Sequence, residues 1–489
     1  MSSTRRKFIE SASTLPALAS AAQALLSIPA SAATEEYQAS LLPSKNEVWE
    51  WQVWMAKLGP KYTGNRAHRT FVEFLAKYLS DAGLDVSRDH FSFPRWEARR
   101  WEIMVTPQTG SVFTAPVTSY FPYSGQTPAA GVTGDLVYAG TSPHFDLSGK
   151  LKGNIAIIDC PSSERPYGEW YKVWGVYPAD LKFPSSVRPA RSSVNQLTEF
   201  QKAGALGVIL VWTDISDANA ADQYTPFSRP LQNIPGLWVA RETGATLRIL
   251  ARDGARATLT LEAEIIPDTP TDTLIAALPG TSTDEVIIVN THTDGPNAIE
   301  ENGGLGILAL AKYFAQIPKD QRRRTLVFAL TTGHFAGPWV PSIRGVIDKH
   351  PELIKKAVAA VTIEHLGCRE WADDASFNYK ATGENELSVA LSPHQSTANV
   401  LLECLQGSAN RRDAVVNPVK GGFLGEGSAL ARAGVPTIGY MPMPNYLLAG
   451  PQNGCIEKVS PELLHSQIEV FAKVIHQFDK MTAAQLKTA

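Results

Sequence analysis

The sequence predicts an α/β protein built on a mostly parallel sheet with helices on both faces. From about residue 265 to the end of the chain, strand-like and helix-like segments alternate. The strand-like segments are continuous runs of apolar and β-branched residues, as at 285–290, which is typical of strands buried on both faces. At 489 residues the chain is also too long for one ordinary core, so more than one domain is expected.

The first elements of this fold are predicted between residues 45 and 92. Residues 47–57 and 65–82 have the apolar spacing of helices, and Gly83 is a typical stop after the second helix. An extended segment begins at residue 84. These elements belong to the first part of the main domain, which we place at residues 34–130.

A second unit is predicted at residues 131–262. Short apolar strands separated by turn residues occur there, at 135–138, 152–159 and 207–212, with one helix at 194–203. The segment 161–190 is rich in Pro, Trp and Tyr and lacks periodicity, so we expect a loop. No cluster of metal-ligand type is found in this unit, which indicates recognition or packing.

The remainder of the main domain is predicted at residues 263–489. Its expected elements are strands at 285–292, 324–332, 359–365 and 435–441, and helices at 303–315, 342–357, 396–407, 427–433 and 460–478.

Composition and charge exclude several classes of function. A formal charge of -3 with interspersed signs leaves no basic stripe to follow phosphates, so nucleic acid is not an expected partner. After the first 33 residues no apolar run approaches the ~20 residues of a stable membrane span. The four cysteines contain no Cys-x-x-Cys pair, and whether Cys368 and Cys455 form a disulfide stays open.

The N-terminus carries the pattern of an export signal. Arg5 and Arg6 form a twin-arginine pair, and a moderately apolar Ala/Leu/Ser stretch follows and ends in small residues at 30–33. We interpret residues 1–33 as a cleavable twin-arginine signal peptide. The export machinery is then a partner, and the mature protein is expected to be periplasmic or secreted.

Residues that could carry chemistry follow the predicted strands. His292, Asp294, Glu300 and Glu301 lie within ten residues at the carboxyl end of the strand 285–292. Later strand ends carry His334, Glu364 and His365. Carboxyl ends of neighbouring parallel strands meet at one crevice. Imidazole and carboxylate ligands with an open position are typical of a catalytic zinc site. Glu426, after a Gly-rich turn, is interpreted instead as an exposed residue in the first turn of a helix.

The motifs of this chain resemble those of a known family. Residues 285–306, with THTDG and EENGGLG, look like the metal-binding motifs of the co-catalytic zinc exopeptidases, which include secreted leucyl aminopeptidases, aminopeptidase Y and glutamate carboxypeptidase. Residues 131–262, with SGKLKGNIAIIDC and FQKAGALGVILVW, resemble the β-rich protease-associated domain often inserted in that family. The resemblance covers nearly all of the mature chain.

The resemblance implies roles for individual residues. His292 matches the first zinc-binding His, and Asp294 matches the carboxylate that orients it. Glu301 stands where the family has the Asp that bridges two metals, and Glu364 where it has the second Asp. One set of metal ligands is therefore retained in type.

The second set of ligands departs from the family. His334 replaces the general-base Glu and Phe335 replaces a metal-binding Glu, while the late metal-binding His falls near Asn445 and Tyr446. The resemblance therefore implies one zinc ion rather than two. His334 is then expected to be the general base, since an imidazole is suited to proton transfer near neutral pH.

Three interpretations stay open. In the first, His292, Glu301 and Glu364 hold one zinc that activates water for cleavage of a peptide or other small amide substrate. In the second, His334 or His365 joins the ligands, and the rearranged site acts on a non-peptide substrate. In the third, the protein is an inactive peptidase-like binding protein. We expect an exported, metal-dependent hydrolase of the zinc exopeptidase type, with His292, Glu301, Glu364 and His365 as metal ligands and His334 and Asp294 as catalytic residues.

Overall fold

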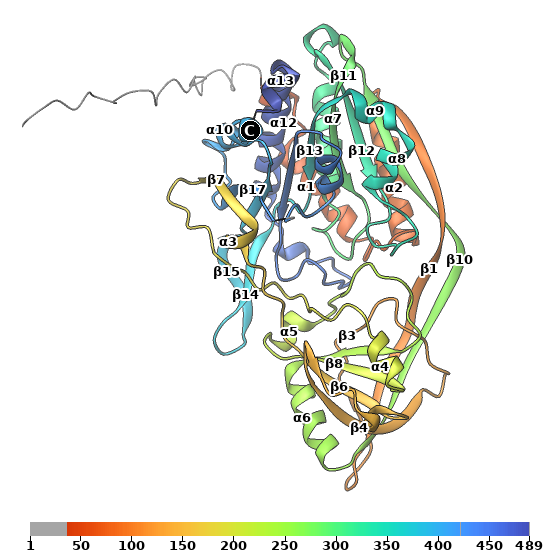
Figure 1. Ribbon diagram of the computed structural model, residues 1–489. Coiled ribbons are helices and arrows are strands. Elements are labelled where there is room, and N and C mark those ends of the chain that lie inside the picture. The colour runs from red at the N-terminus through yellow and green to blue at the C-terminus, as the bar shows by residue number, and fades with distance from the viewer. Residues whose placement is uncertain (1–36, 421, 489) are drawn as a thin grey trace, which may run out of the picture.

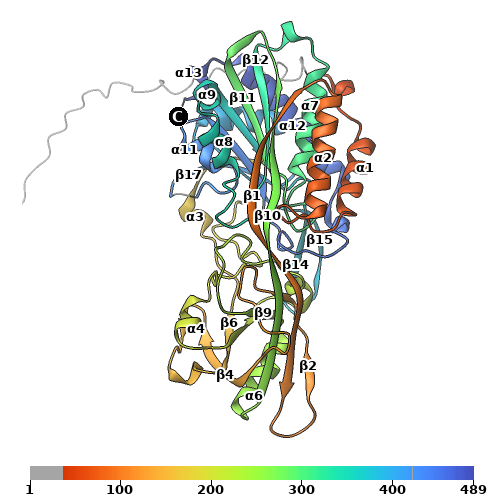
Figure 2. The ribbon, with the colours of Figure 1, turned by 90° about the vertical axis from the view of Figure 1, so that its right-hand side faces the viewer.

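Two long antiparallel strands, β1 (Asp85–Thr106) and β10 (Arg256–Leu278), run the length of the molecule and connect an upper and a lower lobe (Figures 1 and 2). The structure is a computed structural model that describes residues 37–488 except Gly421. The predicted signal peptide therefore lies outside the described residues. The strand β10 is rich in β-branched residues, and more buried and more exposed positions alternate along parts of both strands.

The upper lobe contains the predicted sheet. From β10 its strand order is β12, β11, β13, β18, β16, β17 and β7. The strands β12, β11, β13 and β18 are parallel to one another, as their buried, uninterrupted apolar runs indicate. The predicted fold class is confirmed. The bounds are β7 (Tyr171–Tyr177), β11 (Ser282–His292), β12 (Arg324–Thr331), β13 (Ala357–Ile363), β16 (Ser388–Leu391), β17 (Asp413–Pro418) and β18 (Thr437–Pro442).

Helices cover both faces of this sheet. One face packs its apolar side chains against α1 (Lys45–Ala56), α2 (Arg66–Asp81), α7 (Gly303–Ala315), α10 (Gln395–Leu405), α12 (Pro461–Lys480) and α13 (Ala483–Leu486). The other face packs against α8 (Ile343–Lys349), α9 (Pro351–Lys356) and α11 (Gly427–Arg432). A hairpin of β14 (Arg369–Asp373) and β15 (Tyr379–Asn385) extends from the sheet. No helix among the described residues is long and apolar enough to cross a membrane.

The lower lobe has a smaller sheet with α6 (Arg241–Arg252) on one face and α4 (Thr198–Lys202) on the other. The strands of the lower lobe are β2 (Phe113–Ala115), β3 (Ser119–Tyr120), β4 (Val132–Thr141), β5 (His144–Phe145), β6 (Ile155–Cys160), β8 (Gly207–Trp212) and β9 (Gly236–Val239), with the short helix α5 (Asp217–Ala220) in a loop. The short helix α3 (Tyr167–Trp170) packs instead against the edge of the upper sheet, beside β7. The strands β2 and β3 lie in this lobe although they precede residue 131.

The structure differs from the sequence-based prediction at two segments and settles the state of two cysteines. The segment 161–190 is not only a loop, because it contains β7, which pairs with β17 at the edge of the upper sheet. The predicted helix 342–357 is two helices, since Pro351 has no N–H to continue the first one. Cys368 and Cys455, whose pairing the sequence left open, are buried free thiols.

The close approach of α7 to the sheet fixes the segment that precedes it. A Cβ added at Gly303 would lie 2.2 Å from the carbonyl oxygen of Ile363 and 2.3 Å from Oγ1 of Thr291. Only glycine allows the start of α7 to lie between β11 and β13 in this way. The segment 295–302 is thereby held over the carboxyl ends of both strands.

We expect Gly303→Ala to destabilise the protein although alanine is the better helix former. The added methyl group meets backbone that cannot move cheaply, and such overpacking costs about 1–3 kcal/mol. Urea denaturation should give a lower midpoint for Gly303→Ala and an unchanged one for Gly149→Ala, where an added Cβ meets nothing within 4 Å. Equal midpoints for both variants would contradict this account of the packing.

Candidate metal centre

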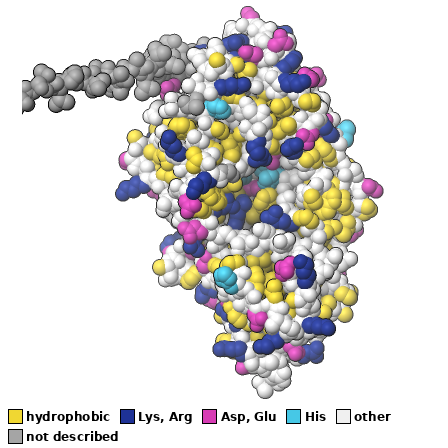
Figure 3. All heavy atoms as spheres, viewed as in Figure 1, with side chains coloured by type: hydrophobic (Ala, Val, Ile, Leu, Met, Phe, Trp, Pro, Cys, Tyr) yellow, Lys and Arg dark blue, Asp and Glu magenta, His cyan; other side chains and the backbone are white. Residues whose placement is uncertain are grey.

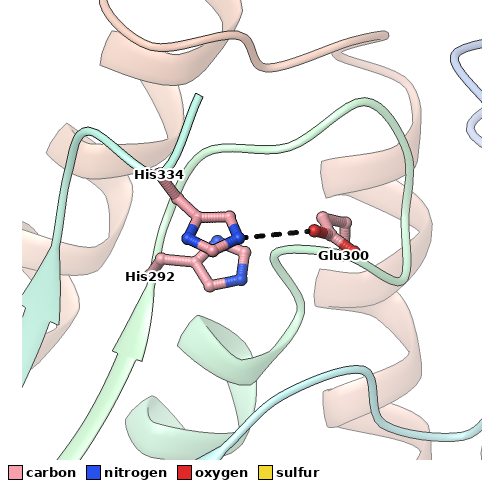
Figure 4. Close-up of side chains that lie close together, drawn as sticks. All are labelled: His292, Glu300 and His334. Atoms are coloured by element: carbon pink, nitrogen blue, oxygen red, sulfur yellow. Dashed lines mark ion pairs between the residues drawn. The ribbon is translucent and has the colours of Figure 1, made fainter. Parts of the chain in front are cut away.

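Three neighbouring strand ends bring the predicted side chains together. The strand β11 ends at His292, β13 is followed by Glu364 and His365, and β12 is followed by the loop that carries His334. Since β12, β11 and β13 are adjacent and parallel, these ends share one edge of the sheet. Figure 4 places the His334 ring over the His292 ring, with Glu300 opposite them.

The rings of His292 and His365 are both oriented by backbone carbonyl groups. Nδ1 of His292 donates to the carbonyl of Asp294 at 2.8 Å, and Nδ1 of His365 donates to that of Pro442 at 2.7 Å. The two Nε2 atoms are buried and have no hydrogen-bond partner. A metal-binding histidine is held in just this manner, with one nitrogen on a carbonyl and the other free for the ion.

Two carboxylates face these nitrogen atoms. Oε2 of Glu364 lies 3.6 Å from Nε2 of His292 and 3.9 Å from Nε2 of His365. Oε2 of Glu300 lies 3.1 Å from Nε2 of His365 but without hydrogen-bond geometry. Ligand atoms around a tetrahedral zinc ion are ~3.3–3.5 Å apart, given metal–ligand distances of ~2.0–2.2 Å. The spacing and the donor types fit such an ion.

These groups form two overlapping sets with ligand atoms within 4.8 Å of one another. One set is His292, Glu364 and His365, and the other is His292, Glu300 and His334. Both belong to the part of the chain that the structure describes, and both share His292. The overlap describes one compact centre rather than two separate ones.

The buried charges of the centre depend on one another. Burial would lower the pKa of His292, but the carboxylates of Glu364, Glu300 and Asp294 outweigh it and raise that pKa to about 10. Burial would raise the pKa of Glu300, but the three surrounding histidines lower it to about 2. The carboxylates therefore place a negative potential around the imidazole nitrogens.

His334 lies at the open side of the centre. Its ring stacks on that of His292, with centroids 4.2 Å apart, and on that of Phe227 at 5.0 Å. Its Nδ1 donates to Oε1 of Glu426 at 3.1 Å, while Nε2 lies 3.9 Å from Oε1 of Glu300. The side chain is 19% exposed, so His334 connects the buried centre with the cavity outside.

Glu426 is buried and not exposed as its sequence context suggested, with only 5% of the residue accessible. Its Oε2 accepts hydrogen bonds from the hydroxyls of Thr331 and Ser342 and from the N–H of Ile343. Burial would raise its pKa, but the hydrogen bond and charge of His334 and the Ser342 hydroxyl lower it to about 2. An ionised Glu426 thus fixes the Nδ1–H tautomer of His334.

The carboxylate of Asp294 holds the loop of His334 instead of the ring of His292. Its Oδ2 accepts from the N–H groups of Gly333 and Phe335, at 3.2 and 2.9 Å, and from the hydroxyl of Thr63. His292 is bound by the backbone carbonyl of Asp294. One residue thereby positions both stacked imidazoles.

Glu301 belongs to neither set of potential ligands. Its Oε1 forms an ion pair with Nζ of Lys61 at 2.6 Å, and both side chains are fully buried. Lys61 also donates to the carbonyl of Gly59 at 2.8 Å, and burial lowers its pKa to about 7. Glu300, the preceding residue, faces the imidazoles in its place.

Several residues that position the site had no sequence signal. Asn297 donates to three carbonyl groups of the 446–449 loop and accepts from the N–H groups of Ile299 and Glu300. Lys61 lies far along the sequence from the metal-ligand motifs of residues 285–306. The polar groups of Asn445 and Tyr446, near which the late histidine was expected, are bound to Ala190, Gln223, Trp371 and Arg369.

Comparison of the structure with solved structures shows the fold. A zinc aminopeptidase from Bacillus subtilis is similar with a TM-score of 0.63 and 16% identity, covering 91% of this chain and 98% of its own. A peptidase M28 precursor from Shewanella amazonensis SB2B has a TM-score of 0.63 and 17% identity, and the match covers 90% of this chain and 98% of that one. An aminopeptidase from Aneurinibacillus sp. strain AM-1 has a TM-score of 0.56 and 14% identity, and the match covers 89% of this chain and 93% of that one.

No protein-family model matches the chain, and no curated protein matches it. The fold that the sequence resemblance implied is therefore confirmed by structure alone.

We expect Lys61→Met to destabilise the protein strongly, because it leaves the buried carboxylate of Glu301 unpaired. Breaking one partner of a buried ion pair costs about 3–5 kcal/mol. Thermal and urea unfolding would measure the loss, and the double variant Lys61→Met/Glu301→Gln should recover part of it. Lys77→Met, which breaks an exposed pair with Asp81, is the matched control and should unfold close to wild type.

The same variants separate the two roles open to Glu301. If Glu301 only neutralises Lys61, then Glu301→Gln should leave the metal content of purified protein unchanged, as judged by elemental mass spectrometry. Loss of metal from Glu301→Gln would make Glu301 a ligand, as the sequence resemblance implied.

Proposed function

We propose that the protein is a metal-dependent hydrolase that cleaves peptide or other amide bonds with one zinc ion, held by His292, Glu364 and His365. The observation that carries this proposal is a set of buried atoms without hydrogen-bond partners: Nε2 of His292, Nε2 of His365 and Oε2 of Glu300. Each such atom costs about 1–3 kcal/mol if it stays unsatisfied, and one cation compensates all of them. The zinc aminopeptidase fold supports the same assignment.

When bound, the zinc ion supplies Lewis-acid polarisation of the amide carbonyl and lowers the pKa of water at its open position. Glu300 lies beside the ligand set and within 3.9 Å of His334 Nε2. It helps neutralise the ion and orients the proton-carrying ring. Exclusion of bulk water by the buried surroundings strengthens all of these interactions.

His334 is the proposed general base and acid. Its Nδ1–H is engaged by Glu426, so the lone pair is on Nε2, which faces the centre. Nε2 takes a proton from the attacking water and gives it to the leaving amine. Glu426 and Asp294 are positioning residues, since they hold the ring and its loop and contact no reacting atom.

The central prediction concerns metal content and turnover measured together. His292→Ala and His365→Ala should lose bound zinc in elemental mass spectrometry, because each removes a ligand. His334→Ala should keep the zinc and lose turnover by about 10²–10⁴-fold, the usual contribution of general acid–base catalysis. Turnover is followed as release of new amines from a library of aminoacyl and acyl amides.

Other outcomes select the other interpretations. Zinc loss in His334→Ala would make His334 a ligand of a rearranged site. A wild-type protein that takes up no zinc on reconstitution would contradict the hydrolase and favour a peptidase-like binding protein.

Glu426→Gln provides a separate test of positioning. The amide keeps the shape but loses the charge that fixes the tautomer of His334, so kcat should fall while KM and zinc content stay near wild type. Glu426→Asp should restore part of kcat. A fall in zinc content instead would show that Glu426 supports the ligands and not the base.

Export through the twin-arginine pathway is part of the proposal and rests on the sequence of residues 1–33. Arg5→Lys combined with Arg6→Lys should keep the protein in the cytoplasm, whereas Lys7→Arg should not. Cell fractionation and N-terminal sequencing of the exported form would measure this. Export of the double variant would exclude that pathway.

A further inference from the structure

A cavity of about 580 Å³ opens beside His334, between the two lobes. Three arginines, Arg165, Arg191 and Arg229, line it together with His334 and Phe227, and no acidic residue does. Figure 3 shows basic side chains and a histidine gathered in the hollow near the middle of this face. The wall of the cavity is therefore cationic, although the protein as a whole carries a net negative charge.

Two of these arginines form no direct ion pair. Among the described residues, the guanidinium groups of Arg165 and Arg191 form no ion pair and no side-chain hydrogen bond, while the nearby Arg188 pairs with Glu164 at 2.7 Å. Burial lowers the pKa of both. For Arg191 the charge of Arg165 adds to this effect and the carboxylate of Glu300 opposes it, and the pKa is lowered to about 10. Two partly buried positive charges beside each other are unfavourable unless an anion joins them.

The backbone presents the two side chains from a fixed ribbon. Arg165 and Val187 exchange both backbone hydrogen bonds, at 2.8 and 3.1 Å, and the N–H of Ser163 donates to the carbonyl of Arg191 at 2.7 Å. This ribbon is part of the segment 161–190 and its continuation, which the sequence left without a role. Two antiparallel bridges fix the register of this ribbon, so the backbone positions of both arginines are set before any ligand binds.

A ring connects the arginines to the proposed base. The guanidinium carbon of Arg191 lies 5.5 Å from the ring centroid of Phe227, and Phe227 stacks on His334 at 5.0 Å. A group bound by Arg191 thus lies one aromatic ring away from His334. That separation suits a substrate whose charged group is a few bonds from the bond to be cleaved.

We propose that Arg165 and Arg191 form an oxyanion-binding subsite, and that the substrate is an amide carrying a carboxylate, sulfate or phosphate group. The guanidinium fork matches the planar or tetrahedral oxygens of such groups with two hydrogen bonds each. The substrate assignment rests on the proposed hydrolase function, whereas binding of the anion does not.

Isothermal titration of the full mature protein tests the subsite without catalysis. Succinate, inorganic sulfate and inorganic phosphate serve as probes, with neutral succinamide as the reference. We expect at least one anion to bind, succinamide not to bind, and the affinity to weaken with added salt. The preferred anion identifies the charged group of the substrate.

Variants assign the binding to the two arginines. Arg165→Gln and Arg191→Gln should each weaken binding by about 10- to 100-fold, as expected for hydrogen bonds to a charged group. Arg191→Lys keeps the charge but loses the guanidinium fork, so its affinity for the anion should lie between that of the two Gln variants and that of wild type. Arg188→Gln is the matched control on the same ribbon and should bind like wild type. Circular dichroism confirms that each variant is folded.

The outcomes separate failure of this inference from failure of the hydrolase. If no anion binds wild type, or if Arg165→Gln and Arg191→Gln bind as well as wild type, the subsite is excluded. His292→Ala should still bind the anion, so loss of binding there would move the anion to the metal centre and also overturn the subsite.

In active enzyme, kcat/KM for acidic amides should fall in the arginine variants, while kcat/KM for neutral amides stays unchanged. Equal losses for both kinds of amide would exclude the substrate assignment. Anion binding by the arginines in a protein without turnover would overturn the hydrolase alone.

Discussion

The structure around the sheet edge depends on one constraint, which is that a buried carboxylate must be compensated. Five acidic side chains lie there almost without solvent, namely Asp294, Glu300, Glu301, Glu364 and Glu426. An ionised carboxylate in such surroundings costs several kcal/mol unless charge or hydrogen bonds replace the lost water. Most of them have found fixed protein partners: backbone N–H groups for Asp294, Lys61 for Glu301, and hydroxyls with His334 for Glu426. Glu300 and Glu364 face imidazoles, and only Oε1 of Glu364 has a backbone partner, the N–H of Glu426. This unfinished compensation is the basis of the proposed cation site.

Lys61 explains how the remainder of the site could change without leaving uncompensated charge. In the family that the sequence resembles, the residue matching Glu301 bridges two metals. Here an ammonium group lies 2.6 Å from that carboxylate, and Phe335 packs among Tyr224 and Leu448 where a metal-binding Glu is expected. A buried lysine supplies one positive charge with no need for further ligands. In the proposed one-zinc centre, Lys61 therefore supplies the positive charge beside Glu301 that a second metal supplies in that family.

The sequence predicted the strands that end at the site because their apolar runs are long and uninterrupted. It predicted His292, His334, Glu364 and His365 as neighbours, because parallel strand ends must converge. It could not distinguish Glu300 from Glu301, since the direction of two adjacent side chains is set by the hydrogen bonds of Asn297 and not by periodicity. It also missed the burial of Glu426, whose partners come from the distant loop 331–343.

The segment 161–190 was also misjudged from sequence, because its structure depends on pairing with a strand far along the chain. The strand β7 was invisible in sequence because its partner, β17, lies over two hundred residues later, and pairing of that range has no local signal. This pairing fixes one end of the ribbon that carries Arg165 and Arg191 to the upper sheet. The continuous ladder of β1 and β10 ties the lower lobe to the same sheet. The cavity beside His334 is thus held on two sides by β-pairing, and its selectivity depends on residues placed in advance more than on closure around a substrate.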